Sequence, residues 1–373
     1  MWPTWMQTSE PMAGVLRPVW RPEEAGAQWL TDVLRGAGVI GERRVVDVVA
    51  KPVGTGQMAD SVRLALTYDA PAPHAPTTVV GKFTPADETS RATALALRTS
   101  EVEVRFYREV VGTVGIRTPR WYFADVDPAT AEFALLLQDM APARQGDQMA
   151  GCTVEEAALA LAELARLHAP RWGDPVLEGL SWLDRSNPGD GSGELLALLF
   201  DGFVERYGNE LDDGVIGVGR HLFPRIGSYL APRPGPRTVQ HADFRLDNLL
   251  FDTDHGTPTV TVVDWQTVTL GPGPADVSYF LGAGLVPEER RAHEEELVRE
   301  YHDRLLADGV RDYSWETCMT DYRRYAYAGY VMAVGASMLV ERTARGDEMF
   351  LTMARRHAAQ VEDLGSARLL DAD

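Results

Sequence analysis

The stretch His241-Ala242-Asp243-Phe244-Arg245-Leu246-Asp247-Asn248 decides how this sequence is interpreted, together with Asp264-Trp265-Gln266 sixteen residues later. Two short apolar runs lie between them, at 248–251 and 260–264, and the second run ends on the acid. Asp254-His255-Gly256 separates the runs and favours a tight turn. The sequence therefore predicts a β-hairpin with an amide at its start and a carboxylate at its end. The alternative is a surface hairpin whose acids are incidental.

The residue types at these positions suit phosphoryl transfer from ATP. That reaction needs a carboxylate that accepts the proton of the substrate hydroxyl, and an amide oxygen and a second carboxylate that hold magnesium on the phosphates. Asp243 and Asn248 are five positions apart, which is the interval between the corresponding residues of a protein-kinase catalytic loop. Asp264 lies where the magnesium-binding Asp of a D-F-G motif would fall.

Lysine is rare in this chain, since only Lys51 and Lys82 are found among its 36 basic residues. Lys82 lies in the apolar, β-branched run Thr77–Phe83, which predicts a buried strand. A buried ammonium group needs a partner for its charge. The lysine of such a strand in a protein kinase has two partners, the ATP phosphates and a glutamate on the next helix. The alternative is a strand-end lysine whose ammonium group reaches water.

Two more strands are predicted before the Lys82 strand, so that the three form an antiparallel meander. Arg44–Val53 is apolar and β-branched, and Ser61–Tyr68 alternates with period two. The turn between them, Gly54-Thr55-Gly56-Gln57-Met58-Ala59, keeps two glycines of a G-x-G-x-x-G loop. Backbone N–H groups of such a loop approach the phosphates of ATP. The alternative is an ordinary hairpin turn.

A long helix is predicted for Arg91–Val111, because apolar residues recur there at helical spacing. Glu101, Glu103 and Glu109 are its acids. We select Glu103 as the partner of Lys82. The alternative is that Glu103 is a solvated acid on the helix surface.

A hinge is predicted near residue 140. The strands predicted at 120–124 and 132–138 precede it, and Pro142 ends the second of them. Backbone groups near Gln138 and Met140 are expected to be open to the adenine of a nucleotide. Beyond this point the sequence becomes mostly helical.

The predicted fold class is α+β, with a smaller β-rich lobe that binds nucleotide and a larger, mostly helical lobe. The first lobe is expected to span residues 1–140 and to begin with a helix at about 23–36. The second is expected to span 141–373 and to carry the catalytic and acceptor-binding residues. Its predicted helices cover roughly 154–169, 194–207, 286–307, 315–345 and 347–364.

The motifs occur in an order typical of one group of enzymes: Lys82, Glu103–Tyr107, Leu136–Met140, His241–Asn248 and Asp264. In these residues the chain resembles the aminoglycoside phosphotransferase family and its relatives, the choline-kinase-like and ecdysteroid-kinase-like enzymes. The resemblance spans about residues 45–285, and its second half is the more specific. It implies a protein-kinase-like fold of two lobes with ATP between them.

The resemblance also implies a role for each matched residue. Asp243 would be the catalytic base, and Asn248 and Asp264 would be the magnesium ligands. Lys82 would hold the α- and β-phosphates of ATP, braced by Glu103.

Two departures from the family and one further match complete the comparison. Asp276 matches an acid that braces the catalytic loop in the family. Ala242 stands where the family usually has glycine. Asp264-Trp265-Gln266 replaces D-F-G, which is common among small-molecule kinases and argues against regulation through an activation loop.

Composition narrows the possible partners. The net charge of −19 argues against nucleic acid and against an anionic membrane. No run approaches the roughly 18 to 20 apolar residues of a membrane span, and Met1–Met6 lacks both the basic and the apolar part of a signal peptide. Cys152 and Cys318 cannot form a disulfide framework, and no Cys/His cluster has zinc spacing. We therefore expect a cytoplasmic protein.

The expected partner is a small hydroxylated substrate. Residues 1–140 carry 14 basic and 17 acidic side chains, whereas 141–373 carry 22 and 38. The acidic second part would suit a cationic acceptor, but it is also typical of an ordinary soluble surface. Aromatic and methionine residues recur within 315–340, where they form core or wall an apolar acceptor pocket. We expect a neutral hydroxylated metabolite rather than an aminoglycoside.

A second class of function is a catalytically silent kinase-fold module that binds nucleotide or a partner protein. Modules of that kind tend to lose a metal ligand. Here Lys82, Asp243, Asn248 and Asp264 are all present. Their presence favours the enzyme.

Overall fold

The computed structural model describes residues 16–54, 59–184 and 192–372, which fold into two compact units. The first unit runs to Thr113 and adds Thr118–Pro142 and Val263–Thr267. The second consists of Val114–Arg117, Ala143–Val262 and Val268–Asp373. Each unit thus includes a short segment from the other side of the predicted hinge. The segment Val263–Thr267, which contains Asp264, belongs to the first unit.

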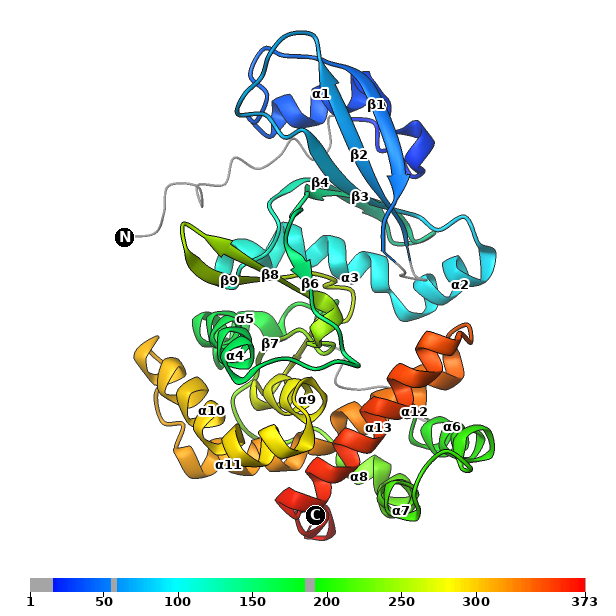
Figure 1. Ribbon diagram of the computed structural model, residues 1–373, viewed down its shortest axis with the longest axis vertical. Coiled ribbons are helices and arrows are strands. Elements are labelled where there is room, and N and C mark those ends of the chain that lie inside the picture. Colours follow the sequence, from blue (N-terminus) through cyan, green and yellow to red (C-terminus); the bar gives the residue numbers. More distant parts are fainter. Residues whose placement is uncertain (1–15, 55–58, 185–191, 373) are drawn as a thin grey trace. The chain divides into compact units, whose positions relative to one another are not determined.

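The first unit is built on a five-stranded antiparallel sheet with the order β1-β2-β3-β5-β4 (Figure 1). Its strands are β1 (Val45–Pro52), β2 (Asp60–Tyr68), β3 (Thr78–Phe83), β4 (Trp121–Asp127) and β5 (Glu132–Gln138), and its helices are α1 (Ala27–Gly36), α2 (Glu88–Leu97) and α3 (Thr99–Arg105). Strands β1 to β3 form the predicted meander. Lys82 pairs with Ser61 on one side and with Leu135 on the other, so it lies on an inner strand.

One face of the sheet packs against α1. Val62 and Leu64 of β2 and Phe83 of β3 are buried there with Leu30 of α1. Successive side chains of a strand point to opposite faces. Lys82 directly precedes Phe83, so its side chain belongs to the other face of the sheet.

The helix predicted at about 23–36 begins later than expected. Pro22–Glu24 forms a separate turn of 3-10 helix, and Gly26 is the residue before α1. Glycine is tolerated at a helix N-cap but disfavoured inside a helix, which explains the start at Ala27.

The prediction of one continuous helix over Arg91–Val111 is wrong. Arg98 has φ of 55°, in the left-handed region, and separates α2 from α3. A residue in this conformation ends a right-handed helix. The backbone then continues beyond α3 as a π-turn over Phe106–Val110. The break is not marked by glycine or proline, so the sequence gives no sign of it.

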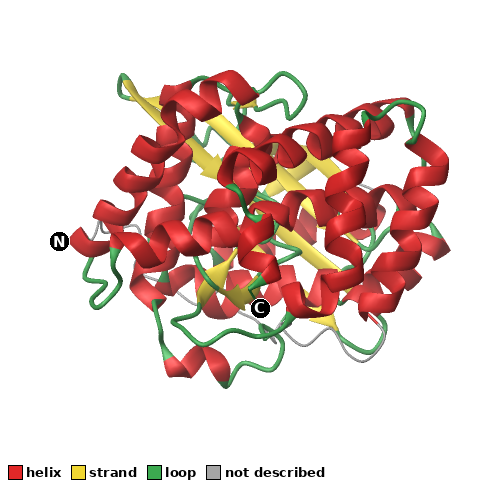
Figure 2. Cartoon of the chain, turned by 90° about the horizontal axis from the view of Figure 1, so that it is seen from below, coloured by secondary structure: helices red, strands yellow, loops and turns green. Residues whose placement is uncertain are grey.

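The second unit is mostly helical, as predicted. Figure 2 shows the helices of the whole chain in red. Its longer helices are α4 (Val154–His168), α6 (Ser192–Tyr207), α7 (Asp213–Leu222), α9 (Pro274–Gly284), α10 (Pro287–Ala307), α11 (Trp315–Arg324), α12 (Ala328–Leu339) and α13 (Ala344–Leu364); α5 (Pro175–Glu178), α8 (Ile226–Leu230) and α14 (Ala367–Asp371) are short. Its strands are β6 (Arg144–Gln145), β7 (Thr238–Gln240), β8 (Leu249–Asp254), β9 (Thr257–Val262) and β10 (Thr269–Gly271). No helix within the described ranges is long and apolar enough to cross a membrane.

The helix predictions for this unit are wrong in one place and miss two of its longer helices, α7 and α9. The single helix expected over 315–345 is divided into α11 and α12 by a turn at Tyr325–Tyr327. Helix α9 was not predicted at all. All of its residues except Ala275 are buried, so it shows no alternation between an apolar and a polar face.

The predicted hairpin is present as β8 and β9. His255 and Gly256 join the strands with φ of 48° and 83°, and a type I′ turn requires positive φ at both central positions. Leu249 pairs with Val262 at the other end of the hairpin. Asn248 directly precedes β8, and the chain to Asp264, the second predicted magnesium ligand, continues from the end of β9. Both therefore adjoin the same end of the hairpin.

Candidate active site

Lys82 lies at the centre of an ion-pair cluster in the first unit. Its Nζ is 2.7 and 2.6 Å from the two carboxylate oxygens of Glu103 and 2.9 Å from Oδ1 of Asp264. Burial alone would lower the pKa of Lys82, but the charges of Asp264 and Glu103 raise it above its ordinary value. The lysine is therefore protonated. Glu101, the neighbouring candidate, pairs with Arg98 instead.

Asp264 is held beside the lysine by the residues that follow it. It has φ of 68°, a conformation that costs a non-glycine residue about 1 to 3 kcal/mol. The fully buried Trp265 ring stacks on Phe106, with 3.9 Å between ring centroids and 7° between ring planes. The backbone N–H of Trp265 donates to Glu103 at 3.3 Å, and Gln266 Nε2 donates to Asp264 Oδ2 at 3.0 Å. The packing of this tryptophan therefore helps to fix the carboxylate.

We expect Trp265→Ala to destabilise the protein by about 3 to 5 kcal/mol, because it empties a buried site and removes the ring stack. Trp265→Phe keeps a flat ring against Phe106 and should lose clearly less. Urea unfolding of both variants checks this. An alanine variant that unfolds at the wild-type urea concentration would show that the stack does not stabilise this segment.

Asp243 accepts three side-chain hydrogen bonds within the second unit. Its Oδ1 accepts from the Tyr279 hydroxyl at 2.7 Å, and its Oδ2 accepts from Asn248 Nδ2 at 3.1 Å and from Arg245 Nε at 3.2 Å. The carboxylate side chain is 14% exposed, so an incoming molecule can reach it. Tyr279 is not identified by the sequence, although it lies only three residues after Asp276.

The Asn248 side chain is fixed through its amide nitrogen. Its Nδ2 donates to the backbone carbonyl of Asp243 at 2.9 Å and to the Asp243 carboxylate. Within the described residues nothing donates to its Oδ1, and an amide oxygen is a ligand that magnesium accepts. No group of three or more His, Cys, Asp or Glu side chains in the described ranges could hold a metal ion. Magnesium bound largely through nucleotide phosphates does not need such a group.

From helix α9, Asp276 fixes the backbone of the candidate catalytic segment, His241–Asn248. Its buried carboxylate accepts from the backbone N–H of His241 at 2.7 Å and from that of Ala242 at 2.9 Å. His168 Nε2 lies 3.3 Å from the same carboxylate, and its Nδ1 lies 2.8 Å from the Tyr301 hydroxyl. Ala242 has φ of 61°, which explains physically why glycine is favoured at this position.

The predicted phosphate loop is described only in part. Gly54 has φ of 76°, which glycine adopts without steric cost. Thr55 and Gly56 lie outside the described residues. On either side of the loop, Val53 N–H donates to the Ser61 carbonyl at 2.9 Å and closes the hairpin. A pocket at this turn is lined by residues 52–54 and 59–62 together with Pro22.

The two predicted adenine-binding positions differ in their hydrogen bonds. The backbone N–H of Gln138 donates to the Arg120 carbonyl at 2.7 Å, so it is engaged within the sheet. The backbone of Met140 has no hydrogen-bond partner among the residues that the structure describes. Between them, Asp139 binds Arg63 Nε at 2.6 Å and anchors this segment to β2.

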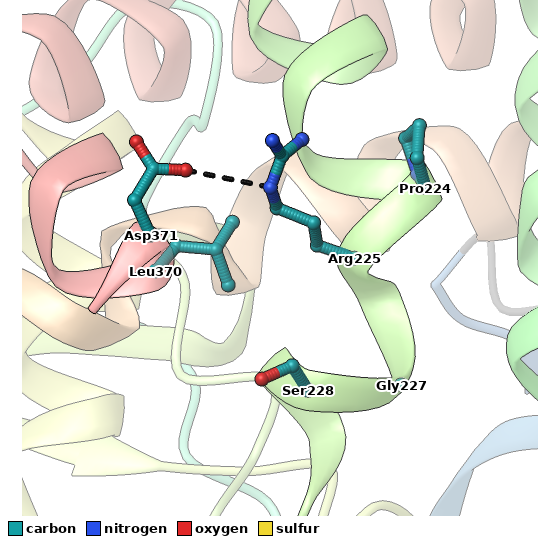
Figure 3. Close-up of a pocket in the computed structure, with 6 residues that line it drawn as sticks. All are labelled: Pro224, Arg225, Gly227, Ser228, Leu370 and Asp371. Atoms are coloured by element: carbon teal, nitrogen blue, oxygen red, sulfur yellow. Dashed lines mark ion pairs between the residues drawn. The ribbon is translucent and has the colours of Figure 1, made fainter. Parts of the chain in front are cut away.

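A separate pocket in the second unit is lined by none of these candidate site residues (Figure 3). It is lined by Pro224, Arg225, Gly227, Ser228, Leu370 and Asp371. Its carboxylate, that of Asp371, already lies 3.4 Å from Arg225 Nε and 2.9 Å from His221 Nε2. Since its acid is paired and none of the candidate site residues lines it, we do not count this pocket as part of the candidate site.

Comparison with known proteins gives a family match over part of the chain. A profile of the ecdysteroid kinase-like family matches residues 218–310, which include the candidate catalytic segment, Asp264 and helix α9. A 56-residue stretch is 43% identical to acyl-CoA dehydrogenase family member 10 of Mus musculus. That stretch covers 15% of this chain and 5% of the mouse protein.

Comparison with solved structures shows the fold. A candidate aminoglycoside phosphotransferase from Ralstonia eutropha JMP134 is 15% identical with a TM-score of 0.54, over 90% of this chain and 97% of that one. An ethanolamine kinase from Plasmodium vivax is 10% identical with a TM-score of 0.51, over 88% and 87% of the two chains. A choline kinase from Cryptosporidium parvum is 9% identical with a TM-score of 0.50, over 86% and 91%.

These comparisons confirm the resemblance that the motifs indicate and the predicted protein-kinase-like fold class. The chain is similar in fold to small-molecule kinases of the aminoglycoside phosphotransferase and choline kinase types. The family match falls on the segment in which its motifs are most specific.

Proposed function

We propose that this protein is an ATP- and magnesium-dependent phosphotransferase that acts on a hydroxyl group of a small molecule. The observation that carries this proposal is the carboxylate of Asp243. It is fixed by three donors, it remains reachable from solvent, and it lies beside an asparagine whose amide oxygen is open. A base and a metal ligand in this arrangement are what phosphoryl transfer to an alcohol requires.

Asp243 is the base in the proposed reaction. It accepts the proton of the acceptor hydroxyl as the hydroxyl oxygen forms a bond to the γ-phosphorus of ATP. The bond between the γ-phosphorus and the β–γ bridging oxygen breaks, and ADP leaves. Magnesium, when bound, neutralises charge on the phosphates, and Asn248 and Asp264 are the residues that would hold it.

Lys82, braced by Glu103, is the proposed ligand of the α- and β-phosphates. The protonated ammonium group suits this role, and Glu103 holds it in place through both carboxylate oxygens. Gly54, Thr55 and Gly56 are the proposed phosphate loop. We propose that adenine binds to the backbone near Gln138 and Met140. Of these two residues, Met140 has backbone groups without a hydrogen-bond partner among the described residues.

We expect weak or no phosphorylation of aminoglycosides. A polycationic acceptor needs several unpaired acids near the base. Asp247 forms an ion pair with Arg245, and Arg345 lies 3.9 Å from Asp247 and 3.8 Å from Asp147. The acids beside the catalytic segment therefore already have arginine partners, which favours a neutral hydroxylated metabolite.

A panel of aminoglycosides and neutral alcohols, assayed for ATP consumption at two salt concentrations, tests both the activity and the acceptor. Turnover with a neutral hydroxylated compound and little with the polycations would support the proposal. Strong activity on the polycations that falls as salt increases would overturn the choice of acceptor, because salt screens attraction between charges.

A further inference from the structure

The two oxygens of the Asp243 carboxylate are not equivalent. An ionised carboxylate offers about two acceptor positions on each oxygen. Asn248 Nδ2 and Arg245 Nε fill both positions on Oδ2, whereas Tyr279 fills one position on Oδ1. Among the described residues no other group donates to this carboxylate. The remaining acceptor position is therefore on Oδ1, beside the tyrosine hydroxyl.

Tyr279, which donates to Oδ1, is fixed by its neighbours, and its hydroxyl remains a hydrogen-bond donor. Burial, with the negative charge of Asp243, raises the pKa of Tyr279 well above its ordinary value, so the hydroxyl keeps its proton. Its side chain comes from α9, and its ring lies 5.8 Å from that of His357 on α13. Gln360 of α13 donates in turn to the Ser278 carbonyl at 3.1 Å, which ties the two helices together next to the tyrosine.

We propose that Tyr279 is a positioning residue that selects Oδ1 of Asp243 as the atom that takes the proton. This inference rests on the proposed function. The acceptor hydroxyl donates to the free position on Oδ1, and its proton moves to that oxygen as the new bond to phosphorus forms. Tyr279 keeps its own proton throughout and directs the carboxylate through one hydrogen bond. Oδ2 remains bound to Asn248 and Arg245.

The test is Tyr279→Phe, which removes only the hydroxyl. Without it the carboxylate can rotate, and a misplacement of the base on the order of 1 Å lowers turnover by roughly 10²-fold. We expect kcat for ATP turnover to fall by about 10- to 100-fold, while the KM for ATP stays within about twofold. Tyr330→Phe is a matched control, since Tyr330 is also buried and its hydroxyl donates to a backbone carbonyl, that of Val215, at 2.8 Å. We expect Tyr330→Phe to keep wild-type kcat.

A double-mutant cycle separates positioning from a general structural role. If Tyr279 acts through Asp243, adding Tyr279→Phe to Asp243→Asn should lower the residual turnover by less than about twofold. An unchanged kcat in Tyr279→Phe, or an equal loss in both backgrounds, would overturn the inference alone. Absence of ATP turnover in the wild-type protein would overturn the proposed function together with it.

Discussion

Asp243→Asn is expected to lower ATP turnover by about 10²- to 10⁴-fold, the usual contribution of a general base, while ATP binding stays nearly intact. The amide has the shape of the carboxylate, but only its oxygen can accept a hydrogen bond. In the wild-type protein each oxygen of Asp243 accepts a hydrogen bond. The amide NH2 group of the variant must therefore face one of these donors. The proton of the acceptor hydroxyl then has no base. Initial rates of ADP formation measure the loss, and ATP titrations measure binding.

The control for this prediction is Asp252→Asn on the same unit. Asp252 is exposed on β8, and among the described residues its Oδ1 accepts only from the backbone N–H of the next residue. The control removes one acid from the hairpin that follows Asp243 in the chain and should keep wild-type turnover. Near-wild-type turnover in Asp243→Asn would show that another group takes the proton.

Lys82→Met is expected to lower kcat/KM for ATP by about 10²- to 10³-fold. This is the usual loss when one group that stabilises charge in the transition state is removed. Methionine has a similar length and no charge. It also leaves Glu103 buried without its cation, which destabilises the protein. Lys82→Arg restores the charge but not the compact ammonium geometry. The arginine variant should therefore recover stability, measured as the melting temperature, more fully than kcat/KM.

Lys51→Met is the matched control, because it removes the only other lysine of the chain. Lys51 lies exposed on the edge strand β1, opposite Arg63 of β2. It should keep the wild-type kcat/KM for ATP. Greater damage from Lys51→Met than from Lys82→Met would contradict the assignment of the phosphate-binding lysine.

The strands and the hairpin could be predicted because their signals are local. Period-two alternation marks β2, and His255-Gly256 supplies the two positive φ values of the turn. Helix α9 carries no such signal, since its burial leaves no polar face. The sequence gives no sign of the break at Arg98 either, because arginine rarely adopts the positive φ found there.

The candidate site could be predicted where chemistry alone limits the choice of residue. A lysine on an inner strand needs an anion, and the structure provides Glu103. The contact between Tyr279 and Asp243 depends instead on how α9 packs, so no spacing in the sequence reveals it. The stack of Trp265 on Phe106 is likewise a tertiary contact.

Slow ATP hydrolysis and nucleotide binding, measured together on the wild-type protein with and without magnesium, test the central claim most directly. Water then takes the place of the unidentified acceptor. We expect ATP at about 100 times its dissociation constant to stabilise the folded protein by about 2.7 kcal/mol when magnesium is present. We also expect ADP to form slowly with magnesium and not in Asp243→Asn. Magnesium-dependent stabilisation with no more ADP than in Asp243→Asn would contradict the account and identify a catalytically silent nucleotide-binding module.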